Sequence, residues 1–338
     1  MGWYVLRRLF WMVPTLLGIT IITFLMMDLA PSDRATIDAQ NLEASRAGDI
    51  QARNEASTRL RVIWGMADPE TGETYPAWQR YLSWLERACR LDFAGEGEDP
   101  GVFRQSISRA LPATLLLNTL ALVLALAIAI PLGAWQGLRI GSLADGLVSV
   151  LMFLLYGLPV FLLATLLAVF LSSGGWAEFF PGSGLRSPGA NSWGPLAQMA
   201  DMVWHLALPV LALTVAPAVI LTRYVRESMA RSMRSGWVLG MRAWGLPERK
   251  IARRALRSAL SPVVTLLGTL VPGLISGSVV VEAVFGIQGL GTLFFDAVMV
   301  REYPMVMALT LLVSVVTLLS LLGSDILHRV VDPRVRLR

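Results

Sequence analysis

The sequence predicts an all-α membrane protein with six transmembrane helices and a polar extracytoplasmic insertion after the first span. Hydrophobic residues make up 55% of the 338 residues, charged residues only 16%, and the mean hydropathy is +0.59, which is too apolar for a soluble fold of this size. Apolar runs of about 20 residues, the length that crosses roughly 30 Å of hydrocarbon, recur along the chain. All but one of the 29 basic residues are arginines, and most of them lie beside these runs.

The six apolar runs define the expected spans. We expect the first to be retained in the membrane, because its apolar core is longer than that of a signal peptide and no small-residue cleavage site follows it. The expected spans are residues 9–29, 111–134, 147–171, 203–222, 262–285 and 305–324. Prolines inside the later runs are expected to kink their helices; they are Pro159, Pro209, Pro217 and Pro272.

The spans divide the chain into four parts. Residues 1–29 form the N-terminus and first span, 30–110 an extracytoplasmic region, 111–327 the core with its five further spans, and 328–338 a cytoplasmic tail. Residues 30–110 are too charged to cross a membrane and are expected to form a small cap, since they offer little core of their own. One amphipathic helix is expected there, with its apolar side chains at helical spacing; they are Trp78, Tyr81, Leu82, Leu85 and Ala88.

Residues 223–261, called the basic loop below, carry ten basic residues against two acids. Their middle, Gly240 to Pro247, predicts two helical pieces around a glycine–proline break. The short outer loops hold only Arg186 and Arg301, so the charge rule places the basic loop and both termini in the cytoplasm. Trp237, Met241 and Trp244 follow at i, i+4 and i+7 as apolar anchors. The loop is therefore either an orientation signal or a docking surface for a soluble partner.

The chain lacks the residues that would power transport or catalysis by itself. The only ionisable groups in the expected spans are Asp28 and Glu282, both near span ends, so a proton relay is poorly supported. A phosphate-binding loop needs a lysine followed by Ser or Thr, but the only lysine, Lys250, precedes Ile251. One cysteine and two histidines build neither an intrachain disulfide nor a zinc site of the usual kind. We therefore expect no catalytic, cofactor or metal site in this chain, and no nucleic-acid partner.

A nucleophile turn is a further possibility that the sequence raises. Gly182-Ser183-Gly184 could supply a serine with His205 as its base. Such a string in a Pro/Gly-rich outer loop is far more often a plain turn. His205 is expected to be an interfacial side chain beside the anchor Trp204.

Specific strings distributed over nearly the whole chain point to one family. They are Tyr4-Val-Leu-Arg-Arg8, His205-Leu-Ala-Leu-Pro209, Arg223-Tyr-Val-Arg226, Glu282-Ala-Val-Phe285, Gly289-Leu-Gly291, Glu302-Tyr-Pro304 and Asp332-Pro-Arg334. With them the chain resembles the membrane permease subunit of ATP-binding-cassette importers of the dipeptide and oligopeptide class, which includes nickel and glutathione relatives. The family usually has Pro-Gly-Asp-Pro where this chain has Pro31-Ser32-Asp33-Arg34. It usually has an acid and two alanines where this chain has Leu239, Gly240 and Met241.

The resemblance implies a type I importer permease fold in a bacterial or archaeal cytoplasmic (inner) membrane. It implies four partners besides the bilayer: a second, similar permease, two ATPase subunits that carry ATP and Mg²⁺, and an extracytoplasmic substrate-binding protein. It also implies that a short coupling helix in the basic loop docks on an ATPase. By position this role falls on Leu239, Gly240, Met241, Arg242, Ala243, Trp244, Gly245, Leu246 and Pro247.

The implied function is ATP-driven import of peptides or similar small solutes. Gly273 and Gly277, flanked by Ser276 and Ser278, either pack helices closely or leave room for the transport pathway. An ion-coupled secondary transporter and a non-transporting membrane scaffold are the alternatives.

Overall fold

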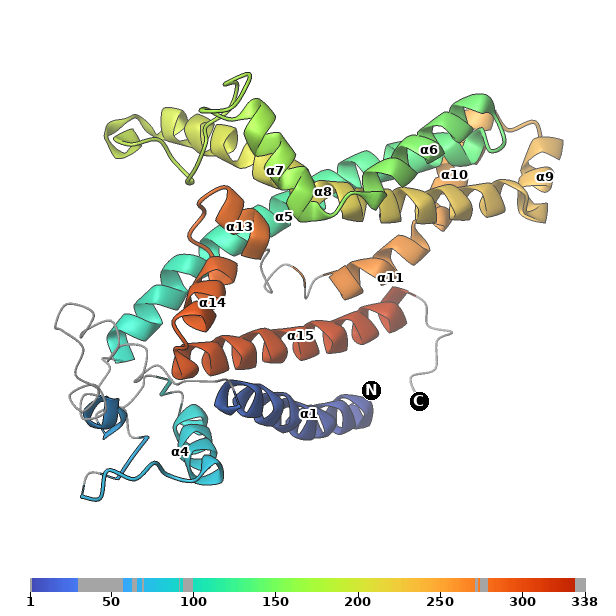
Figure 1. Ribbon diagram of the computed structural model, residues 1–338. Coiled ribbons are helices and arrows are strands. Elements are labelled where there is room, and N and C mark those ends of the chain that lie inside the picture. The colour runs from blue at the N-terminus through green and yellow to red at the C-terminus, as the bar shows by residue number, and fades with distance from the viewer. Residues whose placement is uncertain are drawn as a thin grey trace. The chain divides into compact units, whose positions relative to one another are not determined.

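The computed structural model describes residues 2–29, 57–62, 66–68, 70–90, 92–93, 100–270, 273 and 279–331, and these residues are almost wholly helical (Figure 1). Two isolated β-bridges join Ala67 to Thr74 and Ser172 to Phe180. The predicted all-α class is confirmed. The helices are α1 (Gly2–Asp28), α4 (Ala77–Cys89), α5 (Pro100–Leu138), α6 (Leu143–Gly157), α7 (Val160–Leu171), α8 (Pro195–Met233), α9 (Gly236–Ala243), α10 (Glu248–Ala259), α11 (Ser261–Leu270), α13 (Val279–Val284), α14 (Leu290–Met299) and α15 (Tyr303–Val331), with a 3₁₀ turn at Ala190–Ser192.

Four of these helices, α1, α5, α8 and α15, are long and apolar enough to cross a membrane. They coincide with the predicted first, second, fourth and sixth spans. The predicted third span corresponds to α6 and α7, which meet the same criterion together but are bent by 95°. The predicted fifth span begins with α11 and ends with α13, and residues 271–272 and 274–278 between them lie outside the described residues. Residues 30–56, 63–65, 69, 91 and 94–99 of the predicted extracytoplasmic region and the tail from residue 332 lie outside them as well.

The bend in the third span lies at Leu158 and Pro159. Leu158 takes an extended conformation with φ −81° and ψ 120°, as expected of a residue before proline, and Pro159 begins the next helix as its N-cap. The kink predicted at Pro159 in the span from 147 to 171 is therefore confirmed, and it is a bend of 95°. In contrast, α8 runs without a break through Pro209 and Pro217.

The chain divides into two compact units. The first comprises Met1–Leu111 and Leu290–Leu318. Its core joins α1, α4 and α15 through Phe24, Trp84, Ala88 and Met307. The Tyr303 hydroxyl donates to the Met27 carbonyl at 2.8 Å, and Arg80 pairs with Asp28. These contacts fix α4 and α15 against the C-terminal end of α1.

The predicted amphipathic helix in the first unit is confirmed as α4, but its buried face differs from the prediction. Trp84 and Ala88 are buried, whereas Trp78 and Leu82 are exposed. Tyr81 accounts for the shift, because it meets Phe24 of α1 edge-on and shares a hydrogen-bond contact of 3.0 Å with Thr20. The helix therefore turns the Tyr81–Trp84 side toward α1.

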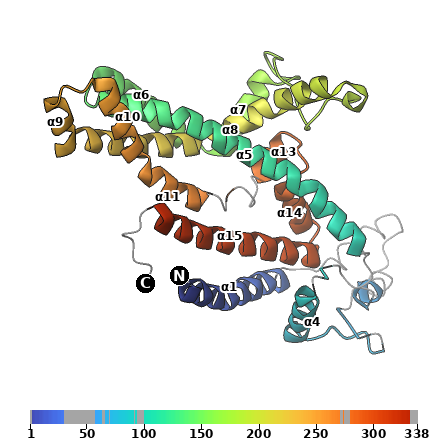
Figure 2. The same cartoon turned by 180° about the vertical axis from the view of Figure 1, so that it is seen from behind.

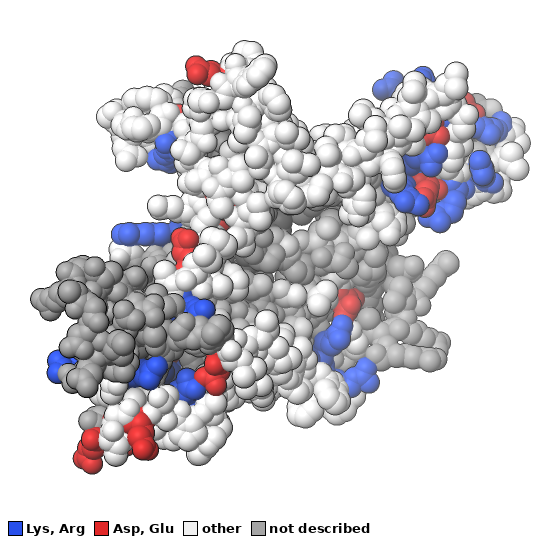
Figure 3. Space-filling model, viewed as in Figure 1, with Lys and Arg blue, Asp and Glu red and all other residues white. Residues whose placement is uncertain are grey.

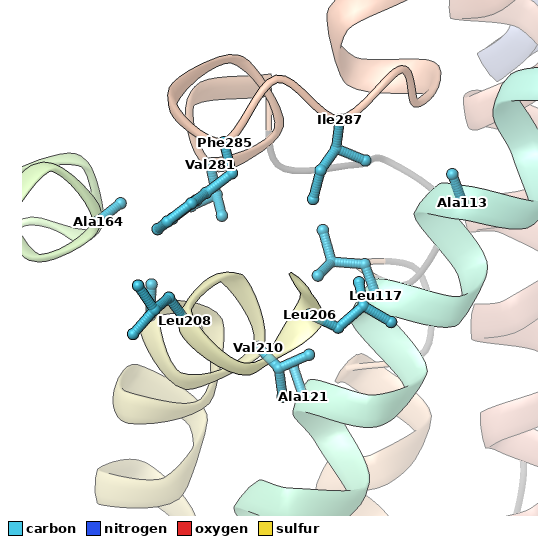
Figure 4. Packing of buried hydrophobic residues seen from close by; sticks show 11 residues of the cluster. Ala113, Leu117, Ala121, Ala164, Leu206, Leu208, Val210, Val281, Phe285 and Ile287 are labelled. Carbon is cyan, nitrogen blue, oxygen red and sulfur yellow. The ribbon is translucent and has the colours of Figure 1, made fainter. Parts of the chain in front are cut away.

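The second unit comprises Pro112–Gly289 and Leu319–Arg338. Its largest apolar cluster joins α5, α7, α8 and α13 around Leu117, Leu206, Leu208 and Phe285 (Figure 4). A second cluster joins α5, α8 and α11 around Leu221 and Val225. Both views of the ribbon place α9 and α10 at the end of α8 that lies beside the start of α6 (Figures 1 and 2). The basic loop is thus carried on one end of a long helix.

Within the second unit, α5 and α8 lie close together at two glycines. A Cβ atom at Gly133 would lie 2.6 Å from the Thr222 carbonyl oxygen, and one at Gly137 would lie 2.6 Å from the Met229 Cβ. Gly133 and Gly137 therefore form a small-xxx-small contact. Sequence reasoning missed this pair and assigned the same motif to Gly273 and Gly277 instead.

Gly137→Ala is expected to destabilise the protein by about 1–3 kcal/mol, because the added methyl group overlaps the backbone and side chain of α8. The measurement is the unfolding midpoint of the purified protein in detergent. Gly146→Ala on α6 is the matched control, since nothing lies within 4 Å of the place that its added methyl group would occupy. Equal midpoints for the two variants would contradict the close α5–α8 contact.

Candidate functional site

The basic loop folds into two helices joined by a glycine turn. Gly245 follows the last residues of α9 with φ +72°, the left-handed conformation that glycine adopts without strain. Its N–H donates to the Arg242 carbonyl at 2.9 Å, and the Leu246 N–H donates to the Met241 carbonyl at 3.1 Å. These two bonds form a Schellman motif, which satisfies the last carbonyls of α9. The predicted break is confirmed, with Pro247 as the N-cap of α10.

One side of this loop packs on itself. Val238 and Met241 of α9 are buried against Ile251 of α10, and Leu246 packs at their edge. Met241 is therefore not one of the surface anchors that its spacing from Trp237 and Trp244 predicted. The reason is that an eight-residue helix needs its own apolar contacts to hold its position.

Other apolar side chains of this loop are exposed. Leu239 is 64% exposed and Trp244 is 85% exposed, while Trp237 is 41% exposed. Large exposed aromatic side chains are typical of the centres of protein interfaces. The predicted segment thus carries exposed apolar side chains on a rigid turn.

An ion pair closes the turn between α9 and α10. Arg242 donates to both carboxylate oxygens of Glu248, from Nε at 2.7 Å and from Nη2 at 3.2 Å. These hydrogen bonds, with the Coulombic attraction, lower the pKa of Glu248 and raise that of Arg242. Because the folded pKa of Glu248 is depressed, the contribution of this pair is present above the ordinary glutamate range and is lost as the pH falls through the lowered pKa.

A second ion pair holds the end of α8 that carries the loop. Arg226 donates to both oxygens of Asp145 on α6, each at 2.7 Å, and the Asp145 side chain is only 3% exposed. Asp145 also accepts from the Gly141 N–H, and Ser142 caps α6 by accepting from the Asp145 N–H. Sequence reasoning missed Asp145, although Ser142 followed three residues later by an acid is a recognisable capping pattern.

Positive charge gathers at this end of the second unit, over α9, α10 and the adjoining part of α8 (Figure 3). Met229 of α8 packs with Ala255 and Ala259 of α10. The helix α10 is therefore fixed to α8 as well as to α9. A displacement of α9 would be passed to α8 through these contacts.

The predicted pathway residues fall at the edge of what the structure describes. Gly273 is exposed, and nothing lies within 4 Å of the place where its Cβ would be. Ser276, Gly277 and Ser278 lie outside the described residues.

A buried polar contact accounts for Glu282 and Gly289, two residues of the strings by which the chain resembles the family. Glu282 and Thr114 are both 0% exposed, and the Thr114 hydroxyl donates to Glu282 Oε1 at 3.0 Å. A Cβ at Gly289 would overlap the ends of both side chains, so any other residue there would force them to move. Glu282 thus links α13 to α5.

His205 and the Gly182–Gly184 loop are held by hydrogen bonds within the fold. His205 is buried, with Nδ1 lying 2.8 Å from the Asp201 carbonyl oxygen, and its position at the membrane interface stays a prediction. The Asp201 carboxylate accepts from the Ser187 hydroxyl at 2.7 Å and lies between Ser187 and His205. In a catalytic triad the histidine, not the acid, lies in the middle. The Gly182–Gly184 turn is held by the Gly184 N–H, which donates to the Phe285 carbonyl at 2.8 Å.

Comparison with known proteins identifies the family. Residues 129–337 match the model of the binding-protein-dependent transport system inner membrane component. The chain belongs to this family.

Three relatives cover nearly the full length of the chain. It is 34% identical over 340 residues to the oligopeptide transport system permease protein AppB of Bacillus subtilis, with 99% of each chain covered. It is 30% identical to the dipeptide transport system permease protein DppB of Lactococcus lactis, with 99% of each covered. It is likewise 30% identical to DppB of Escherichia coli K12, with 98% of each covered. This protein is therefore a multi-pass permease component of an inner-membrane transport system, and the family is a transport family, not an enzyme family.

Asp145→Asn is expected to lower the stability of the permease by about 2 kcal/mol, because it leaves the Arg226 guanidinium without its buried counter-charge. Unfolding midpoints in detergent provide the measurement. Glu227→Gln removes the acid of the exposed Arg223–Glu227 pair on α8 and should cost less than about 1 kcal/mol. A larger effect of Glu227→Gln would contradict the assigned role of Asp145.

Proposed function

We propose that this chain is the permease subunit of an ATP-driven importer of peptides or similar small solutes. The observation that carries the proposal is the rigid, glycine-capped helix α9 with its exposed apolar side chains, within a chain of the binding-protein-dependent transport family. The names of the relatives, oligopeptide and dipeptide transport permeases, support the substrate class.

The importer would contain a second, similar permease, two ATPase subunits and an extracytoplasmic substrate-binding protein. ATP and Mg²⁺ would bind to the ATPase subunits, since this chain contains no lysine-containing phosphate loop. Both termini and the basic loop would face the cytoplasm, as the distribution of arginine indicates.

The coupling segment would be Leu239 to Pro247, with Leu239 and Trp244 as its contacts to the ATPase. The absence of an acid at Leu239 means that these contacts would be apolar. Dimerisation of the ATPases on ATP binding would pull α9, and α10 with it. The packing of α10 on Met229 and the Arg226–Asp145 pair would pass this displacement to α8 and α6.

Transport would follow from alternating access, in which two packings of the spans open the pathway to one side at a time. Gly273, Ser276, Gly277 and Ser278 are the proposed pathway positions, because small side chains leave room for a solute. Hydrolysis would return the permeases to their first state.

Gly245→Trp is expected to leave the protein in the membrane while separating ATP hydrolysis from uptake. A side chain at φ +72° costs about 1–2 kcal/mol, so α9 should leave its docking position, and uptake should fall roughly five- to thirtyfold. The measurement is ATP-driven uptake and ATPase activity of the complete importer in vesicles.

Gly245→Asn is the matched control, since asparagine tolerates the left-handed conformation better than other residues. It should retain most of the uptake. Normal uptake by Gly245→Trp would contradict the coupling role of the turn. Uptake driven by a proton gradient without ATP would instead support a secondary transporter.

Trp244→Ala is expected to reduce the amount of ATPase that purifies with the permease by about tenfold or more, because an exposed aromatic anchor typically contributes at least ~2 kcal/mol to an interface. Trp176→Ala is the control, since Trp176 is equally exposed, at 87%, but lies in an expected outer loop. Equal ATPase recovery with both variants would exclude Trp244 from the docking surface.

A further inference from the structure

We propose that the cavity between α9 and α10 binds the headgroup of an anionic phospholipid of the cytoplasmic leaflet. The cavity measures about 380 Å³ and is lined by Lys250, Arg253, Arg254, Arg257, Met241 and Leu246. The proposal uses the cytoplasmic placement of the basic loop but not the transport activity.

The four cations form one stripe along α10. They follow at i, i+3, i+4 and i+7, which places them on one face of a helix. The opposite face is buried through Ile251, Ala255 and Ala259. Since α10 cannot rotate without exposing this buried face, the stripe has a fixed direction.

The positive charge of this stripe is not balanced by the protein. Among the residues that the structure describes, none of the four cations pairs with a carboxylate, and the hydrogen bond of Arg254 goes to the Met241 sulfur at 3.9 Å. Glu248, the acid at the start of α10, is held by Arg242 instead. Four like charges around one cavity repel one another, so a bound anion with several oxygens would stabilise the arrangement.

The position of the stripe favours a lipid as the source of that anion. Only Leu260 separates α10 from α11, the start of the predicted fifth span. Arg257, the cation of the stripe that is nearest to α11, lies four residues, about 6 Å of helix, before it, which is the depth of a headgroup layer. Juxtamembrane clusters of four or more basic residues bind anionic lipids, and Met241 and Leu246 give the cavity an apolar wall for the glycerol end of the lipid.

The alternative anion is an acidic surface of the ATPase. The exposed apolar residues proposed for docking, Leu239 and Trp244, do not line this cavity. The two surfaces can therefore be changed separately, and the experiment distinguishes them.

The test is retention of phosphatidylglycerol by the complete importer, reconstituted with phosphatidylcholine and phosphatidylglycerol, re-extracted in detergent and analysed by native mass spectrometry. Lys250→Gln with Arg253→Gln should weaken phosphatidylglycerol retention about fivefold for each cation removed. The charge-retaining pair Lys250→Arg with Arg253→Lys should retain the lipid, which separates loss of charge from misfolding.

Arg234→Gln with Arg249→Gln is the matched control, because it removes two cations from the same loop that do not line the cavity. This pair should keep wild-type retention. Equal retention by both neutralised pairs would overturn the proposal. So would unchanged lipid retention with loss of the ATPase from the Lys250→Gln, Arg253→Gln variant, since the cavity would then be an ATPase contact. Neither result would affect the proposed transport function.

Discussion

The pairing of Arg226 with Asp145 is the interaction on which the arrangement of the basic loop depends. A guanidinium near the end of a long apolar helix needs a counter-charge, and Asp145 supplies both oxygens from the first turn of α6. This pair fixes the end of α8, to which α10 is packed through Met229. The loop is therefore an extension of the membrane helices, which suits the coupling role proposed for it.

Three glycine positions show three different physical reasons for the same residue type. Gly137 allows α5 to approach the α8 backbone, Gly245 takes a left-handed conformation that ends α9, and Gly289 leaves room for the buried Glu282 and Thr114 side chains. Only the second could be inferred from local sequence, because a helix ending is a local event. The other two depend on side chains that are distant in the sequence.

The position of the turn and of α10 along the chain was predictable from the sequence, but which of their side chains are buried and which are exposed was not. The glycine–proline break located the turn at Gly245, and the charge pattern located α10. Spacing alone could not distinguish the buried Met241 from the exposed Trp244, because both lie on the predicted apolar face and the packing of Ile251 decides between them. His205 shows the same limitation, since its burial follows from the Asp201 contact within the fold.

By itself the sequence determined the all-helical class, the position of the long apolar helices, the glycine break and the basic character of the loop. These properties follow from composition and from short-range periodicity, which depend only on residues that are close together in the sequence. The tertiary structure alone decided the 95° bend between α6 and α7, the α5–α8 contact at Gly133 and Gly137, the Asp145–Arg226 pair and the cation-lined cavity. The angle at a proline and the partner of a buried charge depend on which helices pack together, and that choice is made by residues far apart along the chain.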